Sequence, residues 1–520
     1  MPSWQSNASR DTLIVSLFAL FFFVASVWLS WTGFIGSDDA LYADAALKWL
    51  QQGPLLGTTH FSLRLTTVIP DFLSFKIFGV REFSLILPSL VCGVTIATLL
   101  AFLAVRILGT KFALLAILPF VTAPLFSSMA STPGIDLVEL LFDVASLCLF
   151  LLALERKSRS GLLFLCGLLA GLGWMSRETS VFLVFYYGVL FLAGFRIERR
   201  EYLLIAAGFL AVALGEMLTY FLLTGDLFYR LKISLHHDLV DRSAIHGLFD
   251  REGNLHLNGP VGTILNPFLM IFFNKIFGIM FWVTIPAAVW LFRSPRIPNE
   301  LRAALLAVTI AGAIWLFGVF ALVGKLYLVP RYILFPLFCA SLLVGAWLSQ
   351  ELLPRSKRLA VGLVGAIVLV NVVAINLEDH DYMFPERALV AFIRSTTAMV
   401  YTDHETLRRA AFLLECEDVN ARVSDEPHGP GDLFFYVPAN SAFKERYTGQ
   451  TPTWQAPSSQ YLPLAGEYVV ARFVRPERWP ARLIEAAGLS SLVPQPLMAK
   501  LRGDQGSAFV YSTHALNGSR

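Results

Sequence analysis

Charged residues are scarce in this chain. Asp, Glu, Lys and Arg make up 15% of its 520 residues, whereas hydrophobic residues make up 56%. Soluble domains average about 25% charged residues, so this composition excludes an ordinary soluble protein and predicts one that crosses a membrane many times. The net charge is only +3, and the sequence has no basic tract and no alternation of basic with aromatic residues. Nucleic acid is therefore excluded as a partner.

Cysteine pairs with a recognisable spacing are also missing. The five cysteines are scattered, four of them inside apolar runs, and no pair has the spacing of a metal or redox motif. We interpret them as small buried hydrophobic residues. The chain has no internal repeat and no low-complexity segment, which argues against a secondary transporter built from symmetric halves.

Long apolar runs, by contrast, are abundant. A membrane-spanning helix needs about 20 apolar residues. No small-residue cleavage site follows the first run, so we expect that run to be retained as a signal anchor. The sequence predicts an α-helical polytopic membrane protein with about eleven transmembrane helices, at 12–32, 83–105, 112–132, 137–154, 160–176, 179–195, 202–224, 266–292, 303–324, 332–349 and 359–377.

Lys and Arg in the short connections predict the orientation of these helices. Such residues favour the cytoplasmic side, and here they gather in alternate connections. This pattern places the N-terminus in the cytoplasm, and an odd number of spans then places the C-terminus outside. The basic connections hold Arg106 and Lys111; Arg156, Lys157 and Arg159; Arg196, Arg199 and Arg200; Arg293, Arg296 and Arg302; and Arg355, Lys357 and Arg358.

Three long segments then lie outside the membrane. The C-terminal one alternates strand-like and helix-like stretches, with Asp403 as an N-cap, and predicts a small α/β domain of about 140 residues. We therefore divide the chain into a transmembrane catalytic domain, 1–377, which includes external loops 33–82 and 225–265, and an extracytoplasmic domain, 378–520. The expected strands of the latter are 398–402, 432–437 and 468–474, and its expected helix is 403–414.

An acidic pair, Asp38 and Asp39, follows the first span. Two adjacent carboxylates at the mouth of a span are expensive to place there and seldom serve packing. The residues after them have an amphipathic pattern, in which Tyr42 and Trp49 suit the depth of lipid headgroups. We interpret this stretch as the reaction centre of a membrane enzyme, with amphipathic helices in the first external loop.

A second group of acids opens the fourth expected span. Asp136, Glu139 and Asp143 lie three and seven residues apart, so they share one helical face. Carboxylates inside a membrane usually line a cavity or meet a cation. For Glu139 and Asp143, a structural partnership with an Arg or Lys of a neighbouring span is an equal alternative, whereas the position of Asp136 favours a function.

Cations approach the same side of the membrane at Arg64, Arg177, Lys325 and Arg331. Arginine presents a planar fork of donors that suits a phosphate or pyrophosphate. The alternative for each cation is contact with lipid headgroups.

The second external loop holds four of the nine histidines. Together, His236, His237 and Asp238 could bind a divalent metal ion. Their spacing matches no closed metal motif, and a long external loop collects such residues without any metal.

The order of these motifs resembles that of the GT-C membrane glycosyltransferases. It is most similar to the bacterial protein-mannosyltransferase-like family that also contains the lipid A aminoarabinose transferases. The pattern Asp38-Asp39-Ala40-Leu41-Tyr42-Ala43 is similar to the acidic pair after the first span of that family. Asp136 stands where the family has an acidic residue, and Arg331-Tyr332 resembles its Arg-Tyr element. The resemblance covers most of residues 10–350.

The resemblance implies a GT-C fold and a glycosyltransferase whose donor is a sugar on a polyprenyl phosphate. Asp38 would be the general base on the acceptor, and Asp39 would orient the acceptor or Asp38. One base without a nucleophile partner favours single displacement with inversion. Three residues would shape the acceptor side and four would stabilise the departing phosphate: Tyr42, Asp136 and Glu139 in the first role, and Arg64, Arg177, Lys325 and Arg331 in the second.

The acceptor implied by the resemblance is a component of the cell envelope, which is lipid A or lipopolysaccharide, another glycan, or a protein. The family is bacterial, so the resemblance also implies the inner membrane, with the C-terminal domain in the periplasm. A secondary transporter, or a polymerase or ligase of lipid-linked polysaccharide, is the alternative.

One departure from the family pattern concerns the phosphate. Many members carry a Lys-Pro-Pro element in the first external loop, whereas residues 63–70 of this chain contain no lysine. Arg64 could take the place of that lysine.

Overall fold

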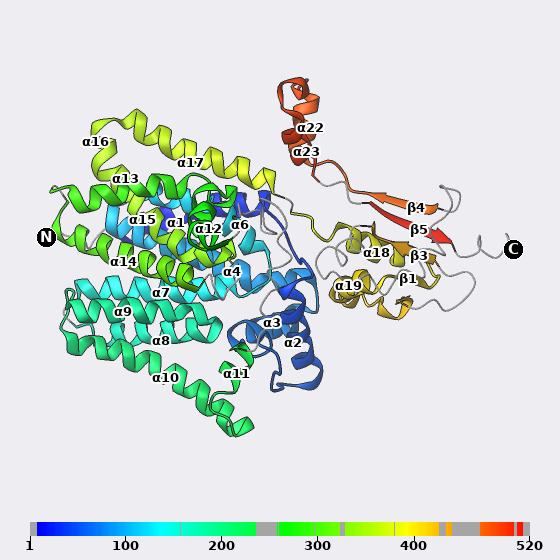
Figure 1. Ribbon diagram of the computed structural model, residues 1–520, viewed down its shortest axis with the longest axis horizontal. Coiled ribbons are helices and arrows are strands. Elements are labelled where there is room, and N and C mark those ends of the chain that lie inside the picture. The colour runs from blue at the N-terminus through cyan, green and yellow to red at the C-terminus, as the bar shows by residue number, and fades with distance from the viewer. Residues whose placement is uncertain are drawn as a thin grey trace.

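The structure is a computed structural model of the chain. It describes residues 8–156, 158–235, 257, 259–295, 297–322, 328–378, 380–425, 433–438, 469–503 and 507–512. Figure 1 shows two parts: a bundle of long, roughly parallel helices, and a smaller sheet with helices near the C-terminus.

The bundle contains most of the helices. Their bounds are α1 (Ala8–Leu29), α4 (Glu82–Leu108), α5 (Leu114–Val121), α6 (Pro124–Ser131), α7 (Asp136–Glu155), α8 (Ser160–Ser176), η1 (Glu178–Ser180), α9 (Val181–Ala193), α10 (Arg199–Thr224), α12 (Gly259–Phe273), η3 (Lys275–Phe277), α13 (Met280–Arg293), α14 (Asn299–Leu322), η4 (Pro330–Ile333), α15 (Leu334–Trp347), η5 (Leu348–Leu352), α16 (Leu353–Arg355) and α17 (Lys357–Leu377).

The helices confirm the predicted fold class. Within the described ranges, seven helices are long and apolar enough to cross a membrane, and the pair α5 and α6, bent by 58°, makes an eighth. Shorter apolar helices, including α8 and α13, accompany them. The predicted run 266–292 is divided between α12 and α13, because η3 interrupts it. A helical bundle suits this sequence because a helix satisfies its own backbone polar groups inside lipid.

Helix α1 shows how an apolar helix packs in the bundle. On α1, Val15, Ala19, Phe23 and Val27 are buried at every fourth position, whereas Phe21 and Trp28 on other faces are exposed. This spacing gives α1 a single packing face.

Helices α8 and α10 approach even more closely. A Cβ atom added to Gly167 would lie 2.0 Å from the backbone oxygen of Ile205, and one added to Gly208 would lie 2.2 Å from that of Phe164. Small residues permit such a close crossing of membrane helices.

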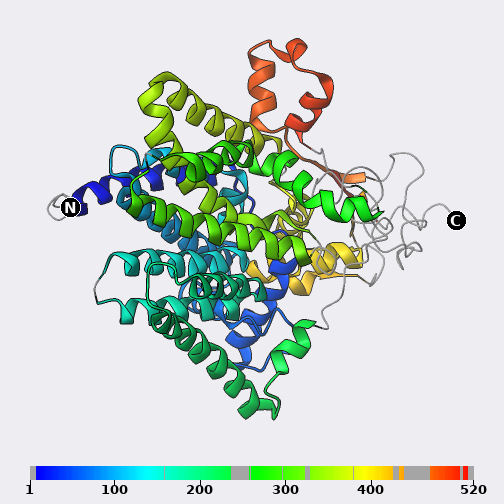
Figure 2. The same ribbon diagram turned by 60° about the vertical axis from the view of Figure 1, so that its left-hand side comes forward.

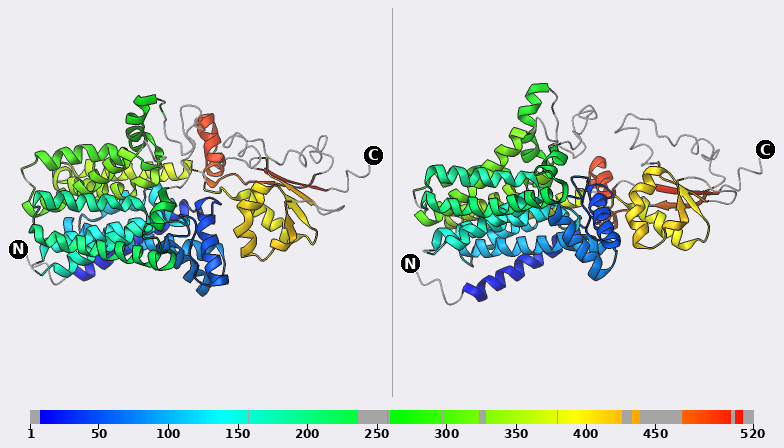
Figure 3. Two further views of the ribbon diagram at one scale, coloured as in Figure 1. Left: turned by 60° about the horizontal axis from the view of Figure 1, so that its bottom comes forward. Right: turned by 90° about the horizontal axis from the view of Figure 1, so that it is seen from below.

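Three further helices lie at one end of the bundle, which we call the loop face: α2 (Asp38–Gln52), α3 (Leu65–Phe78) and α11 (Tyr229–Leu235). Helix α2 runs across this end rather than parallel to the long helices (Figures 1 and 3). This arrangement confirms the prediction of amphipathic helices in the first loop. The buried face of α2 includes Tyr42, Ala43 and Ala46, whereas Leu41 is exposed.

The C-terminal part contains the predicted sheet. The strand order is β2-β1-β3-β5-β4, in which β1 is parallel to β2 and β3, and β5 is antiparallel to β3 and β4. Asp403 caps α19 by accepting from the backbone N–H of Thr406, as predicted. The bounds are α18 (Phe384–Ser395), β1 (Val400–Thr402), α19 (His404–Cys416), η6 (Asn420–Arg422), β2 (Val423–Ser424), β3 (Leu433–Tyr436), β4 (Val469–Val474), α22 (Trp479–Ala486), η7 (Ser490–Leu492), α23 (Gln495–Arg502) and β5 (Ser507–Ser512).

A shared apolar core joins this part to the loop face. The ring of Phe412 in α19 lies 5.0 Å from that of Phe34, just before α2, and 5.9 Å from that of Phe75 in α3. Ala43 of α2 and Leu389 of α18 belong to the same core. Helices α18 and α19 of the C-terminal part therefore pack against the buried face of α2.

Candidate active site

The segment between α1 and α2 sets the position of the acidic pair. The backbone N–H groups of Thr32 and Gly33 donate to the side-chain and backbone oxygens of Ser131, each over 3.0 Å. Phe34 donates its N–H to the Glu82 carboxylate over 2.9 Å. The connection is thereby held to α4 and α6 before it turns into α2.

Asp39 is buried beneath this turn, with 2% of its surface exposed. Its carboxylate accepts the backbone N–H groups of Ile35 and Ser37, both over 2.6 Å, and of Ala40 over 3.1 Å. Burial raises the pKa of Asp39 to about 6, although the three N–H donors oppose this shift and the nearby Asp38 adds to it. Both carboxylate oxygens of Asp39 are thus occupied by the backbone.

Asp38 has the opposite environment. Its side chain is 43% exposed at the first turn of α2, and its Oδ2 accepts from Nη2 of Arg331 over 3.0 Å. Arg331 comes from η4, at the start of the most buried span. An accessible carboxylate therefore stands beside a guanidinium at the loop face.

The acids of α7 hold a second arginine. Nη1 of Arg177 donates to Asp136 over 2.6 Å and to Glu139 over 3.1 Å, and Nε of Arg331 lies 3.8 Å from the same Asp136 oxygen. The Arg177 guanidinium also lies over the ring of Tyr332, 5.3 Å from its centroid. The predicted shared face of α7 thus becomes the anchor for two arginines.

Deeper along α7, two hydroxyl residues after Arg177 donate to the carboxylates of Glu139 and Asp143. Thr179 and Ser180 donate to Glu139, and Ser180 also donates to Asp143 over 3.2 Å. Glu139 and Asp143 are both buried. Glu139 is therefore part of the arginine cluster, whereas Asp143 accepts from Ser180 through Oδ2 and, among the described residues, its buried Oδ1 has no hydrogen-bond partner.

A third arginine reaches the site through Tyr42. Nη1 of Arg64 donates to the Tyr42 hydroxyl over 2.6 Å, and Nη2 lies 3.7 Å from the Glu178 carboxylate. Burial raises the pKa of Tyr42, so the hydroxyl keeps its proton near neutral pH. Arg64 is close enough to Arg177 for the two positive charges to repel. Arg64 is thus held between Tyr42 and Glu178.

The ion pairs that hold Glu178, and through it Arg64, were not predicted from the sequence. Glu178 also pairs with Arg230 of α11 over 3.2 Å, and Arg230 donates two hydrogen bonds to Glu216 of α10. No motif marks Arg230. The signal that could have indicated a cation here was Glu216 in a predicted span, because a carboxylate inside a membrane usually meets a cation.

The arginines retain unused donors. Within the described part of the chain, the Nε atoms of Arg64 and Arg331 are buried and have no hydrogen-bond partner. A buried N–H without a partner is costly. Three arginines with two spare donors form a cradle that suits an anion with several oxygens.

The structure does not test two predicted elements of the site. Lys325, and the proposed metal ligands His236, His237 and Asp238, lie outside the described residues. Among the residues that are described, no group of three or more His, Cys, Asp or Glu side chains could hold a metal ion.

The chain is similar to known proteins in both sequence and structure. The family model of dolichyl-phosphate-mannose-protein mannosyltransferases matches residues 72–219. ArnT from Cupriavidus metallidurans, in its apo state, is similar to the chain with a TM-score of 0.58 and 14% identity, over 84% of this chain and 95% of ArnT. The chain has the GT-C fold. The predicted resemblance is confirmed.

Other GT-C structures are similar at comparable levels. ArnT bound to undecaprenyl phosphate has a TM-score of 0.53 and 13% identity, over 83% of this chain and 94% of ArnT. The archaeal oligosaccharyltransferase AglB from Archaeoglobus fulgidus, in complex with an inhibitory peptide and a dolichol-phosphate, has a TM-score of 0.51 and 13% identity, over 90% of this chain and 73% of AglB. No curated protein matches the sequence.

Proposed function

We propose that this GT-C chain is a glycosyltransferase that moves a sugar from a polyprenyl phosphate to an acceptor of the cell envelope. The observation that carries the proposal is the accessible Asp38 carboxylate, 3.0 Å from Arg331. Arg331 in turn shares Asp136 with Arg177. A base and a phosphate cradle therefore lie side by side, as a transfer from a lipid phosphate requires.

In the proposed reaction, Asp38 acts as the general base. It takes the proton of an acceptor hydroxyl or amine while that atom attacks the anomeric carbon of the sugar. The bond between the anomeric carbon and the phosphate oxygen breaks, and the electron pair leaves with the polyprenyl phosphate. This single displacement inverts the anomeric centre, and general base catalysis contributes about 10²–10⁴-fold.

The three arginines stabilise the leaving group. Negative charge grows on the phosphate in the transition state, and fixed donors aimed at that charge lower the barrier. Arg331 and Arg177 are held by acids of α2 and α7, and Arg64 by Tyr42 and Glu178. These partners fix the guanidiniums before the donor binds, so little reorganisation is needed.

We assign the two neighbouring aspartates different tasks. Asp38 is the catalytic residue, because its carboxylate is exposed. Asp39 is a positioning residue, because its oxygens accept three backbone N–H groups of the turn. Tyr42, Asp136 and Glu139 shape the site by orienting the arginines.

The setting of the reaction is part of the same proposal. We propose that residues 1–377 form the catalytic domain and 378–520 an extracytoplasmic domain, and that the loop face lies in the periplasm of a bacterial inner membrane. Fusion of alkaline phosphatase after residue 520 tests the orientation. Alkaline phosphatase is active only outside the cytoplasm, so an inactive fusion would contradict the proposed orientation.

The activity is tested with purified protein, a radiolabelled sugar on polyprenyl phosphate, and extracted envelope acceptors. We expect Asp38→Asn to lower turnover by about 10²–10⁴-fold. Asp44→Asn is the matched control, since Asp44 is exposed on the same helix and pairs with Lys48. Wild-type turnover in a folded Asp38→Asn protein would remove Asp38 as the base. Transport of the intact donor without sugar transfer would favour the transporter instead, and growth of a polymer would favour a polymerase.

A further inference from the structure

A cavity of about 430 Å³ lies on the far side of the segment that leads to Asp38, away from the proposed catalytic residues. It opens where α1 and α17 end, since Leu29 and Asn376 line it. The C-terminal part supplies the opposite wall, through the turn that leads into α22. Figures 1 and 2 show α22 and α23 beside the end of α17, at the level of the loop face.

Arginines dominate the polar lining of this cavity. Arg387, Arg475, Arg478 and Arg482 face three acids. Each acid has an arginine partner: Glu82 and Asp381 pair with Arg387, Asp381 also lies 3.6 Å from Arg475, and Glu477 lies 3.5 Å from Arg502.

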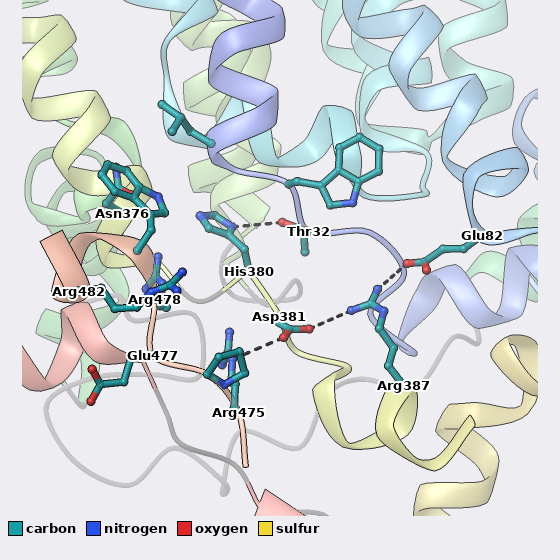
Figure 4. A pocket seen from close by; sticks show the side chains of 14 residues that line it. Thr32, Glu82, Asn376, His380, Asp381, Arg387, Arg475, Glu477, Arg478 and Arg482 are labelled. Atoms are coloured by element: carbon teal, nitrogen blue, oxygen red, sulfur yellow. Dashed lines mark hydrogen bonds and ion pairs between the residues drawn. The ribbon is translucent and has the colours of Figure 1, made fainter. Parts of the chain in front are cut away.

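Within the described residues, no acid pairs with Arg482. Figure 4 shows Arg478 and Arg482 close together, with the Glu477 carboxylate turned away from them. With four arginines and three acids, the described lining of the cavity has an excess of positive charge. A phosphate suits this charge, because arginines bind its oxygens with paired donors.

The apolar surroundings identify where such a phosphate comes from. Trp31 and Trp479, which both line the cavity, are 42% and 47% exposed. Tryptophan at the end of a membrane span marks headgroup depth. Leu483 and Leu492 are also exposed on the α22–α23 hairpin, whereas its inner residues Met498 and Leu501 pack with Leu377, the last residue of α17.

The α22–α23 hairpin is thus packed against the end of α17, and its leucines Leu483 and Leu492 are exposed. Such a helix lies in the membrane interface, with its apolar side in lipid and its cations at the headgroups. Basic pockets at the ends of spans bind anionic headgroups. A soluble anion would need the arginines but would leave the exposed leucines and tryptophans without a partner.

We propose that this cavity binds the phosphate of an anionic phospholipid, and that the α22–α23 hairpin rests on the same leaflet. No step of the proposed sugar transfer uses this site. The site is therefore separate from the donor cradle of Arg64, Arg177 and Arg331.

The test uses the full-length protein in phosphatidylcholine nanodiscs, with phosphatidylglycerol added in steps and bound lipid counted by native mass spectrometry. The pocket variant is Arg478→Gln with Arg482→Gln. The matched control is Arg394→Gln with Arg408→Gln, which removes the same charge from exposed positions of α18 and α19 outside the cavity.

We expect wild type and control to retain one phosphatidylglycerol, and the pocket variant to bind it about tenfold more weakly. Equal retention by all three proteins would overturn the proposal. Displacement of the lipid by millimolar inorganic phosphate would indicate a free-anion site and would overturn the lipid assignment.

A second measurement uses only the wild type, so it does not depend on how the variants fold. We expect amide hydrogen exchange in α22 and α23 to slow when phosphatidylglycerol is added, because the lipid covers the hairpin. Unchanged exchange would overturn the proposal.

Discussion

Two arginine clusters flank the short segment between α1 and α2, and they differ in the burial of the acids that hold Arg177 in one and Arg387 in the other. In the cluster beside Asp38, Arg177 is 5% exposed and is held by acids of a membrane-spanning helix. In the cavity beside α22, Arg387 is 34% exposed, and Arg482 is exposed to solvent. Both clusters suit a phosphate, but Arg177 is held by two buried acids, whereas the acids that pair with Arg387 are 28% and 39% exposed.

This difference indicates what each cluster can do. A buried guanidinium held in place by acids has little to reorganise when charge develops, so it can lower a barrier. An exposed guanidinium at headgroup depth is screened by water, so it can hold a lipid but contributes little to a transition state. Four variants test the contrast.

The largest effect is expected from Arg177→Gln. This change leaves Glu139 buried without its cation and leaves Asp136 with the longer contact to Arg331, and breaking such a buried pair costs about 3–5 kcal/mol of unfolding free energy. Thermal unfolding in detergent measures the loss. Adding Glu139→Gln removes one of the stranded charges and should restore part of the stability. A double variant no more stable than Arg177→Gln would contradict this account.

The next effect is on the reaction itself. We expect Arg331→Gln to lower turnover about 10²–10³-fold, as loss of one preorganised donor does elsewhere, while the protein stays folded. Arg355→Gln is the control, because Arg355 is mostly exposed at the opposite end of the same segment. If both variants turn over at the same rate, Arg331 does not stabilise the leaving phosphate.

Asp39 should make stability depend on pH. Its pKa in the folded protein is about 6, raised from 3.8 by burial. The folded state therefore binds this proton more tightly than the unfolded state does. The resulting contribution to the unfolding free energy is complete below about pH 4 and is lost as pH rises through 6. The difference amounts to about 1–3 kcal/mol. We expect the melting temperature of the wild type to fall with pH between pH 4 and 8 more steeply than that of Asp39→Asn. If the two plots of melting temperature against pH are parallel, Asp39 does not make stability depend on pH.

The smallest effect is expected in the open cluster. Arg387→Gln breaks the ion pairs with Glu82 and Asp381, but about a third of the Arg387 side chain is in contact with solvent. We expect a loss of about 1 kcal/mol or less in unfolding free energy. A loss as large as that of Arg177→Gln would mean that the two clusters do not differ in the way described above.

Several features could be predicted from the sequence because they depend on local pattern. Apolar length determines which segments enter a membrane. The spacing of Asp136, Glu139 and Asp143 put them on one face of α7, because a helix turns every 3.6 residues. The strands β1, β3 and β4 and the cap at Asp403 followed from the same kind of local signal, whereas β2 and β5 were not predicted.

The pairings within the site could not be predicted in this way. Arg331 meets Asp38 across 293 residues of sequence, and Arg177 meets Asp136 across 41. Nothing in the local pattern identified Arg230 as the partner of Glu216 and Glu178. Such pairs depend on how the helices pack against one another in the folded chain.

The acidic pair shows where the two kinds of information divide. The sequence by itself determined that two carboxylates stand at the end of the first span. Only the tertiary structure decided that Asp39 is buried against the backbone of the turn while Asp38 faces Arg331. The reason is physical: consecutive residues at a helix start point in different directions, and what each one meets depends on the elements packed against the helix.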